Sequence, residues 1–382
     1  MKYYIIAGEA SGDLHGANLI RALAQHDPAA EIRYWGGDQM AEACREAGLH
    51  AVQVRHISTL AYMGFLEVVT HLKTILHNMR MCKSDLLAFQ PDAVIYVDYP
   101  GFNLKIARYA HQHGLRNFHY ISPQLWAWKK GRIKKMRKIL DRLYCILPFE
   151  EKFYADNHFA PARYVGHPLL DAVNQFRSNE SAASPFPWSA DKTVALLPGS
   201  RRQELRKVLP QLMEVARRHT DYHFVVAGMS LLGSSIYDEL LKSRPDNLTV
   251  VYDKTYWLLA HSAAAIVCSG TATLETALFG VPQVVCYRAN PISVAIARMV
   301  VSRRVRFISL VNLIADQRIV TELIQNDMTD QNLDRELEAI YIDNPKRDAM
   351  LEGYAMVREM LGGGGASDRV AEDIIRELRI EN

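Results

Sequence analysis

The sequence predicts an α/β fold of two Rossmann-like, doubly wound domains that face a central cleft. Its 382 residues exceed the usual length of one core and suit two domains of ~100–200 residues each. Short apolar, β-like runs alternate with segments of helical spacing, which is typical of a parallel sheet wrapped by helices. The alternation stops at a polar stretch and then resumes, which indicates two such units.

The first domain is predicted to span residues 1–172, with strands at residues 3–7, 32–35, 93–97, 117–121 and 143–147. Residues 171–191 lack periodicity and are rich in Ser, Asn and Pro, so a linker is expected there. The second domain is predicted to span residues 190–361, with strands at residues 194–197, 224–227, 248–251, 265–267 and 283–286. Four glycines open the C-terminal segment, residues 362–382, whose helix packs on the first domain or on a second copy of the chain. A homo-oligomer therefore stays open.

The composition favours a cytoplasmic protein. The five cysteines are far apart and lack the spacing of zinc sites or disulfide frameworks. The N-terminus turns polar after one short strand, unlike a signal peptide, and no apolar run approaches the ~20 residues of a membrane-spanning helix. A net charge of +3, with no recognised nucleic-acid-binding motif, argues against a nucleic-acid partner.

A basic stretch follows two tryptophans. Residues 129–142 contain eight Lys or Arg and one acid. An interfacial anchor is indicated because indoles favour the lipid headgroup layer and cations attract anionic lipid. Its candidate residues are Trp126, Trp128, Lys129, Lys130 and Arg132. A solvated helix face with buried aromatics would give the same pattern.

Residues 61–81 carry a wide apolar stripe at helical spacing beside a basic face. Such a helix lies in a membrane interface or contacts acyl chains, although a core-facing helix shows the same stripe. The candidate contact residues are Phe65, Val68, Val69, Leu72, Ile75 and Leu76.

Open α/β sheets bind ligands at the carboxyl ends of their strands, so the loops that follow the strands are candidate sites. Residues 8–13 (GEASGD) follow the first strand, and their cleft-facing members are predicted to be Gly8, Ser11, Gly12 and Asp13. Alternatively, Ser11 or Asp13 caps the helix that follows.

Asp98 ends a very apolar strand just before Pro100. A carboxylate at this position is a candidate general base for deprotonating an acceptor hydroxyl. A helix N-cap is the alternative role.

Two loops of the second domain have features of anion-binding sites. In residues 196–201 (LLPGSR), Gly199 and Ser200 form a turn, and the Arg201 guanidinium is suited to a diphosphate. The second loop precedes a helix, and its amides predict a phosphate site. It comprises Ser269, Gly270, Thr271, Ala272 and Thr273, with Glu275 one turn into the helix. Glu275 accepts hydrogen bonds from ribose hydroxyls or closes a capping box with one of the threonines.

The sequence contains no Asp-x-Asp pair, Walker loop or dinucleotide fingerprint. Charge stabilisation by Arg201 and helix amides is the consistent substitute for a metal-bound diphosphate. Neither a metal nor a cofactor is therefore expected.

These motifs, together with residues 122–128 (SPQLWAW) and 166–168 (GHP), resemble lipid A disaccharide synthases in identity and order from residue 8 to about residue 325. The resemblance implies a GT-B fold and an inverting β-1,6 transfer in lipid A (lipopolysaccharide) biosynthesis at the inner-membrane surface. The implied donor is UDP-2,3-diacylglucosamine, and the implied acceptor is 2,3-diacylglucosamine 1-phosphate.

The same resemblance implies a catalytic-base role for Asp98 and a donor-site role for Arg201. It also places Asn312, Glu322 and Gln325 in a donor-facing segment. One departure is Val311, where the family often has proline.

Two other functions fit parts of the pattern. A UDP-N-acetylglucosamine 2-epimerase or another UDP-sugar enzyme would use the same second-domain loops without the apolar and basic surface. A non-catalytic membrane-surface protein would keep the basic helices but would not need Asp98.

Overall fold

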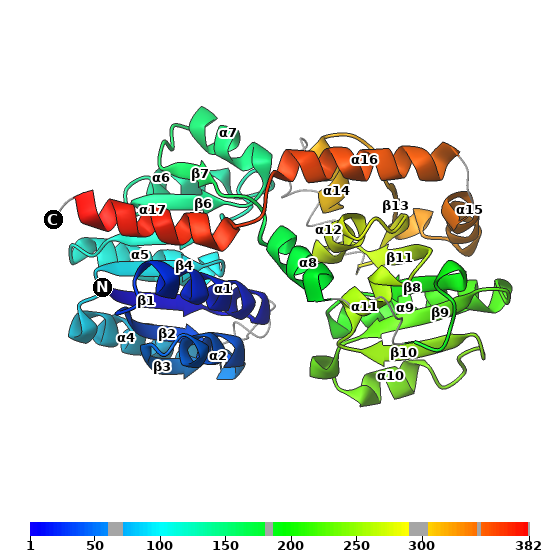
Figure 1. Cartoon of the computed structure of the whole chain (residues 1–382), viewed down its shortest axis with the longest axis horizontal. Helices are drawn as coiled ribbons and strands as arrows, with labels where there is room; N and C mark the ends of the chain where they lie inside the picture. Colours follow the sequence, from blue (N-terminus) through cyan, green and yellow to red (C-terminus); the bar gives the residue numbers. More distant parts are fainter. Residues whose placement is uncertain (60–71, 180–185, 290–304, 342–344, 381–382) are drawn as a thin grey trace. The chain divides into compact units, whose positions relative to one another are not determined.

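The computed structural model describes residues 1–59, 72–179, 186–289, 305–341 and 345–380. They divide into two compact units, Met1–Pro168 with Gly364–Asn382, and Leu169–Gly363 (Figure 1). Each unit is built on one parallel sheet with helices on its faces. Within the described ranges, no helix has the length and apolar character needed to cross a membrane.

The first unit contains a seven-stranded sheet in the order β3-β2-β1-β4-β5-β6-β7. Its strands are β1 (Lys2–Ala7), β2 (Glu31–Gly36), β3 (His50–His56), β4 (Ala93–Val97), β5 (Asn117–Tyr120), β6 (Arg142–Cys145) and β7 (Ala162–Tyr164). The chain builds outward from β1 to β3, then returns to β4 on the other side of β1 and builds outward again. The order therefore reverses between β1 and β4, which leaves the loops after these two strands next to each other.

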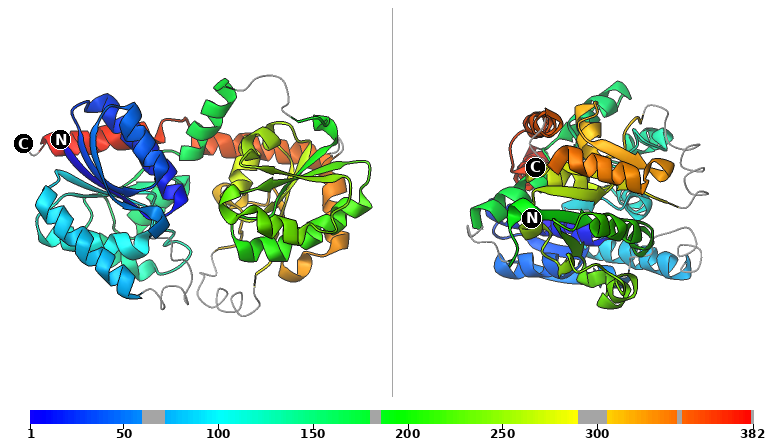
Figure 2. Two further views of the ribbon diagram at one scale, coloured as in Figure 1. Left: turned by 90° about the horizontal axis from the view of Figure 1, so that it is seen from below. Right: turned by 90° about the vertical axis from the view of Figure 1, so that its right-hand side faces the viewer.

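Helices cover both faces of this sheet (Figure 2). One face carries α1 (Ala10–His26), α2 (Asp38–Glu46) and α17 (Ala366–Ile380); the other carries α4 (Leu72–Phe89), α5 (Pro100–Gln112), α6 (Ile133–Met136) and α7 (Pro148–Asp156). Side chains alternate along a strand, so Ile5 of β1 enters the first core and Ile6 enters the second. Burial on both faces explains why the central strands are continuous apolar runs.

The C-terminal helix α17 belongs to the first unit and packs on α1 of the same chain. Ile374 is fully buried in the core that these helices share. Polar contacts flank this core: His26 Nε2 lies 2.7 Å from Asp368 Oδ1, and the Tyr144 hydroxyl donates to Asp373 at 2.9 Å. Of the two packings left open by the sequence, the structure has the one within the chain.

The second unit contains a six-stranded sheet in the order β10-β9-β8-β11-β12-β13, which reverses between β8 and β11. Its strands are β8 (Thr193–Leu197), β9 (His223–Gly228), β10 (Leu248–Tyr252), β11 (Ala264–Cys268), β12 (Gln283–Tyr287) and β13 (Thr321–Ile324). Its helices are α8 (Pro168–Asn179), α9 (Arg202–Arg218), α10 (Ser234–Leu240), α11 (Thr255–Ala260), α12 (Thr271–Leu278), α14 (Leu310–Ala315), α15 (Asp330–Tyr341) and α16 (Pro345–Leu361).

The linker predicted for residues 171–191 is wrong over its first half, because α8 continues to Asn179. Pro168 suits the first position of a helix, where its missing N–H costs nothing. Leu169, Leu170 and Val173 then bury one side of the helix. Polar residues between these positions hid the helical spacing from the sequence reading.

We expect Ile374→Ala to lower the free energy of unfolding of the first unit by about 2–5 kcal/mol, because it opens a cavity between α17 and α1. Ile380→Ala, at a position on the same helix that is 69% exposed, is the matched control and should change it by less than about 0.5 kcal/mol. Urea unfolding followed by circular dichroism measures both. Equal effects at the two positions would contradict the packing of α17 on α1.

Candidate active site

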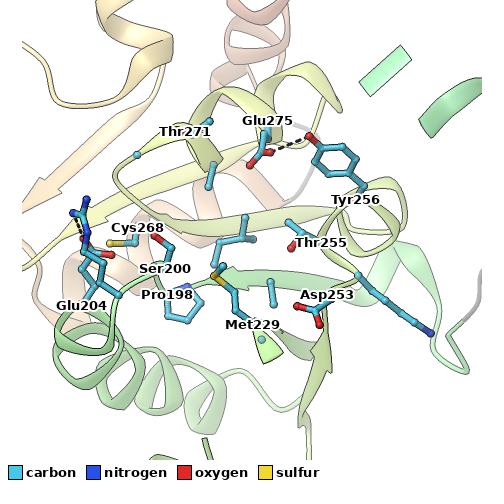
Figure 3. A pocket seen from close by; sticks show the side chains of 18 of the residues that line it. Pro198, Ser200, Glu204, Met229, Asp253, Thr255, Tyr256, Cys268, Thr271 and Glu275 are labelled. Atoms are coloured by element: carbon cyan, nitrogen blue, oxygen red, sulfur yellow. Dashed lines mark hydrogen bonds and ion pairs between the residues drawn. The ribbon is translucent and has the colours of Figure 1, made fainter. Parts of the chain in front are cut away.

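The second unit contains a cavity of about 720 Å³ at the carboxyl ends of its strands (Figure 3). This volume is in the range of small-molecule sites. Its lining comes from the segments that follow β8, β9, β10 and β11, with contributions from α8 and α12. The lining includes eight predicted donor residues, namely Gly199, Ser200, Arg201, Ser269, Gly270, Thr271, Ala272 and Glu275.

The loop after β8 depends on a glycine. Gly199 has a φ of +110°, and a Cβ there would lie 2.8 Å from the Glu204 Cβ and 2.7 Å from its Oε2. Glu204 packs under this turn and accepts a hydrogen bond from Arg201 Nη1 at 3.2 Å. The Arg201 side chain is 66% exposed, whereas Glu204 is 15% exposed. The loop thus presents a guanidinium to the cavity mouth, and Glu204 limits its directions.

The loop after β11 ends in the N-terminus of α12, which begins at Thr271. The first amides of a helix have no partner within it and carry partial positive charge, so they bind anions. Gly270 is the N-cap residue and has no side chain to occupy these amides. The buried Thr273 donates from Oγ1 to the Gly270 carbonyl at 2.8 Å and fixes the turn.

Glu275 does not form the capping box considered from the sequence. Its Oε1 instead accepts a hydrogen bond from the Tyr256 hydroxyl at 3.0 Å, across the cavity wall (Figure 3). Burial raises the pKa of Glu275, and the hydrogen bond from Tyr256 opposes that rise.

Asn312, Glu322 and Gln325 do not line this cavity among the described residues. The Glu322 carboxylate accepts hydrogen bonds from the amide of Ser309 at 2.9 Å, from its hydroxyl at 2.8 Å and from Asn312 Nδ2 at 2.9 Å. Asn312 is fully buried, and its Oδ1 accepts from the amides of residues 319 and 320. The Asn312 side chain thus makes its hydrogen bonds within the second unit, and its predicted contact with the donor stays a prediction.

This network reaches the loop after β11 through two hydrogen bonds. The Ser269 hydroxyl donates to the Ile308 carbonyl at 2.9 Å, and the Leu310 amide donates to Thr273 Oγ1 at 3.2 Å. The Ile308 amide in turn donates to Glu322 at 3.1 Å. Gln325 has a φ of +56°, and its carbonyl accepts from Arg288 at 3.4 Å. Residues 308–325 thus contact the loop after β11 without lining the cavity themselves.

Asp98 follows β4 in the first unit, at the reversal of strand order. Asp98 and Tyr99 both have a φ of +49°, and Ile121, after the neighbouring β5, has a φ of +67°. Such backbone costs about 1–3 kcal/mol per residue and clusters at functional sites. Helix α5 begins at Pro100 with Tyr99 as its N-cap residue, so Asp98 does not cap it. Burial raises the pKa of Asp98, and the Tyr99 amide opposes this in part.

The residues of the 8–13 loop have different roles: Gly8 allows close packing, and Asp13 makes hydrogen bonds to the backbone. A Cβ on Gly8 would overlap the Tyr99 ring, so this glycine permits Tyr99 to pack beside Asp98. Gly12 is buried and Ser11 is exposed in the first turn of α1. Asp13 is 3% exposed and accepts from the amides of Gly37, Gln39 and Met40, so it caps α2. The cleft-facing position predicted for Asp13 is therefore corrected, since its carboxylate is used inside the unit.

The predicted lipid-contact residues differ in exposure. Trp126 is half-buried and donates from its indole nitrogen to Glu150 at 3.1 Å, which fits the buried-aromatic alternative. Trp128 is 44% exposed, with Lys129 Nζ 4.0 Å from its ring centroid. Lys130 is exposed and Arg132 is half-buried.

On the apolar stripe, Leu76 is 45% exposed and Ile75 is half-buried. Phe65, Val68 and Val69 lie outside the described residues, as does the side chain of Leu72.

Several cavity residues escaped the sequence analysis. They are Phe176 of α8, Met229 after β9, and Asp253, Lys254, Thr255, Tyr256 and Trp257 after β10. The rule that ligands bind after strand ends would have pointed to the loops after β9 and β10, although their residue types carry no motif. Among the described residues, one cluster has the spacing of metal ligands, His26 with Asp368 and Glu372, and it belongs to the α1–α17 contact outside this cavity.

Two doubly wound parallel sheets of this kind define the GT-B fold class, which is the architecture of many glycosyltransferases and of several other sugar enzymes. The fold matches a glycotransferase of kitacinnamycin with a TM-score of 0.66 at 17% identity, over 99% of each chain. It also matches UDP-GlcNAc 2-epimerase from Neisseria meningitidis bound to UDP-GlcNAc, with a TM-score of 0.62 at 14% identity, over 100% of each chain. These similarities show the fold alone.

Sequence comparison identifies the particular family. The family model described as Lipid-A-disaccharide synthetase matches residues 3–361. The lipid-A-disaccharide synthase of Geobacter sulfurreducens is 37% identical over 98% of this chain and 96% of its own. That of Acidobacterium capsulatum is 39% identical over 95% of this chain and 92% of its own. The chain belongs to the lipid-A-disaccharide synthase family.

We expect Gly199→Ala to destabilise the second unit by about 2–4 kcal/mol and to lower transferase activity at least tenfold, because the new Cβ meets Glu204 and the positive φ becomes strained. Gly362→Ala is the control. Gly362 also has a positive φ, +70°, but open space surrounds it, so this substitution should cost only about 1 kcal/mol of backbone strain. Chemical unfolding and an activity assay measure the pair. Similar losses for both variants would rule out the Glu204 contact as the cause.

Proposed function

We propose that this chain transfers 2,3-diacylglucosamine from UDP-2,3-diacylglucosamine to 2,3-diacylglucosamine 1-phosphate, which yields the β-1,6 disaccharide 1-phosphate and UDP. The proposal combines family membership with one structural observation: the two loops predicted to bind anions line one cavity of the second unit. A nucleoside diphosphate requires both loops, because its two phosphates carry negative charge that spreads over several oxygens.

The second unit is assigned to the donor. The Arg201 guanidinium and the amides at the N-terminus of α12 would stabilise the charge that develops on UDP as the glycosidic bond breaks. Glu275 is suited to accept hydrogen bonds from two ribose hydroxyls, since a carboxylate offers two acceptor oxygens. Because these groups supply the positive charge, we expect turnover without added divalent metal.

The first unit is assigned to the acceptor, with Asp98 as the base. Inversion requires the acceptor hydroxyl to attack the face of the sugar opposite the leaving diphosphate and to lose its proton during the attack. A pKa raised by burial makes Asp98 a stronger base than an exposed aspartate. The backbone strain at Asp98 and Tyr99 supports a functional reason for this conformation.

Asp98→Asn should lower kcat for disaccharide formation by about 10²–10⁴-fold and leave the donor KM nearly unchanged, because the amide cannot accept the proton. The acid limb of the wild-type kcat/KM profile should lie above the usual aspartate pKa, because the active form is deprotonated and burial raises that pKa.

The assay supplies both diacylated sugars and measures UDP and disaccharide. Asp156→Asn, on an exposed turn of α7, is the control. UDP release with water or with an unacylated acceptor would favour another UDP-sugar enzyme, and full activity of Asp98→Asn would refute the assigned base.

The exposed basic surface around Trp128 is proposed to contact anionic lipid, since both substrates carry acyl chains. Trp128→Ala combined with Lys130→Glu should weaken binding to vesicles that contain anionic lipid by about tenfold or more, since each basic residue near such a surface contributes ~1 kcal/mol. Lys242→Glu, an exposed charge reversal in the second unit, is the matched control. Vesicle sedimentation at low and high salt measures the difference, and equal binding of both variants would argue against this surface.

A further inference from the structure

One wall of the donor cavity contains a tyrosine with no role so far. Tyr256 lies in α11 and Glu275 in α12, so their hydrogen bond of 3.0 Å joins two separate helices (Figure 3). Both side chains line the cavity. The bond occupies Oε1 of Glu275.

We propose that Tyr256 is a positioning residue of the nucleotide site, whose hydroxyl holds the Glu275 carboxylate in place as the acceptor for hydroxyl groups of the nucleotide's ribose. This inference rests on the proposed UDP-sugar function. It adds a residue that acts on the ligand through Glu275, and it predicts that donor affinity, more than the chemical step, depends on Tyr256.

The Tyr256 ring is itself fixed by aromatic packing. Phe176 of α8 meets it edge-on at 5.7 Å between centroids, and Phe279 lies at 5.2 Å. An edge-on contact such as that with Phe176 stabilises a ring orientation by ~0.5–1.5 kcal/mol, and the tilted Phe279 ring adds a second contact. The hydroxyl is therefore held towards Glu275 before any ligand binds, which reduces the ordering that binding must supply.

The hydrogen bond from Tyr256 also affects whether Glu275 is ionised. An ionised carboxylate is the better acceptor for two hydroxyl donors, whereas burial favours the protonated acid and raises the Glu275 pKa. The hydroxyl of Tyr256 stabilises the ionised form and lowers that pKa. Burial and the nearby carboxylate raise the Tyr256 pKa, so its hydroxyl remains a donor throughout the physiological range.

Other ionisable groups also face this cavity. The loop after β8 brings Arg201, the first turn of α9 brings Glu204, the loop after β10 brings Asp253 and Lys254, and β11 brings Cys268. Arg201 is paired with Glu204. Burial raises the pKa of Cys268 to about 12, so it stays a neutral thiol. Arg177 of α8 lies over the Phe279 ring, 5.6 Å from its centroid, at the C-terminal end of α12.

The test is UDP binding to the full chain, measured by isothermal titration calorimetry between about pH 6 and about pH 8. Tyr256→Phe keeps the ring and removes the hydroxyl. We expect it to weaken UDP binding about tenfold at the acidic end, since a hydrogen bond to a charged group is lost and the Glu275 pKa rises. The loss should shrink as the pH rises, because a higher pH favours the ionised form of Glu275 with or without the hydroxyl.

A double-mutant cycle separates positioning from a general effect on the fold. In a Glu275→Gln background, Tyr256→Phe should change UDP affinity by less than about twofold and should lose its pH dependence. Tyr222→Phe, which removes a tyrosine hydroxyl outside the cavity, should bind UDP as the wild type does. In turnover, Tyr256→Phe should raise the donor KM with little change in kcat.

Equal UDP affinity of Tyr256→Phe and wild type at every pH would overturn the inference and leave the proposed function standing. So would an undiminished loss in the Glu275→Gln background. If the wild-type chain did not bind UDP, the proposed function itself would be contradicted.

Discussion

The site depends on the reversal of strand order in each parallel sheet. At β1 and β4 of the first unit, and at β8 and β11 of the second, the chain leaves neighbouring strands towards opposite edges of the sheet. The loops after such a pair diverge and leave room for a ligand between them. Asp98 and the 8–13 loop lie at the first reversal, and the two loops proposed to bind the diphosphate lie at the second. Because the strands are buried on both faces, polar side chains concentrate at the carboxyl ends of the strands. The strand order therefore determines where a ligand site can form.

This placement puts demands on the backbone that the rest of each unit must meet. The turn after β8 is compatible only with glycine at 199, since Glu204 occupies the space a side chain would need. The turn after β4 instead places non-glycine residues at positive φ, and Gly8 makes room for Tyr99 there. Glu322 restrains the Ile308–Ser309 backbone behind the donor loop by accepting several hydrogen bonds at once. Half-buried carboxylates thus restrain the loops of the second unit.

The sequence predicts the central strands and their following loops well, for a physical reason: strands buried on both faces are continuous apolar runs that end abruptly. It missed β3, β7 and β13, and all three lie at the edge of a sheet, where one side is unpaired and the apolar signal weakens. Within the site, glycine-rich and hydroxyl-rich loops were recognisable. Tyr256 and Phe176 were not, because an aromatic residue gains its role from a partner distant in sequence. The roles of Asp13 and Asn312 were misread because their amide partners become neighbours only in the folded chain.

Three carboxylates with a raised pKa show why a raised pKa alone does not identify a catalytic acid or base. Burial raises the pKa of Glu150 to about 7, yet this side chain is 1% exposed and holds Trp126 and the start of α7, so no substrate reaches it. Burial also raises the pKa of Glu275, where a tyrosine hydroxyl works against the shift and favours an ionised acceptor. Asp98 combines a raised pKa with partial exposure, strained backbone and a position at the strand reversal. For Asp98 a single backbone amide opposes the effect of burial, and the proton affinity that remains is what the proposed general base requires.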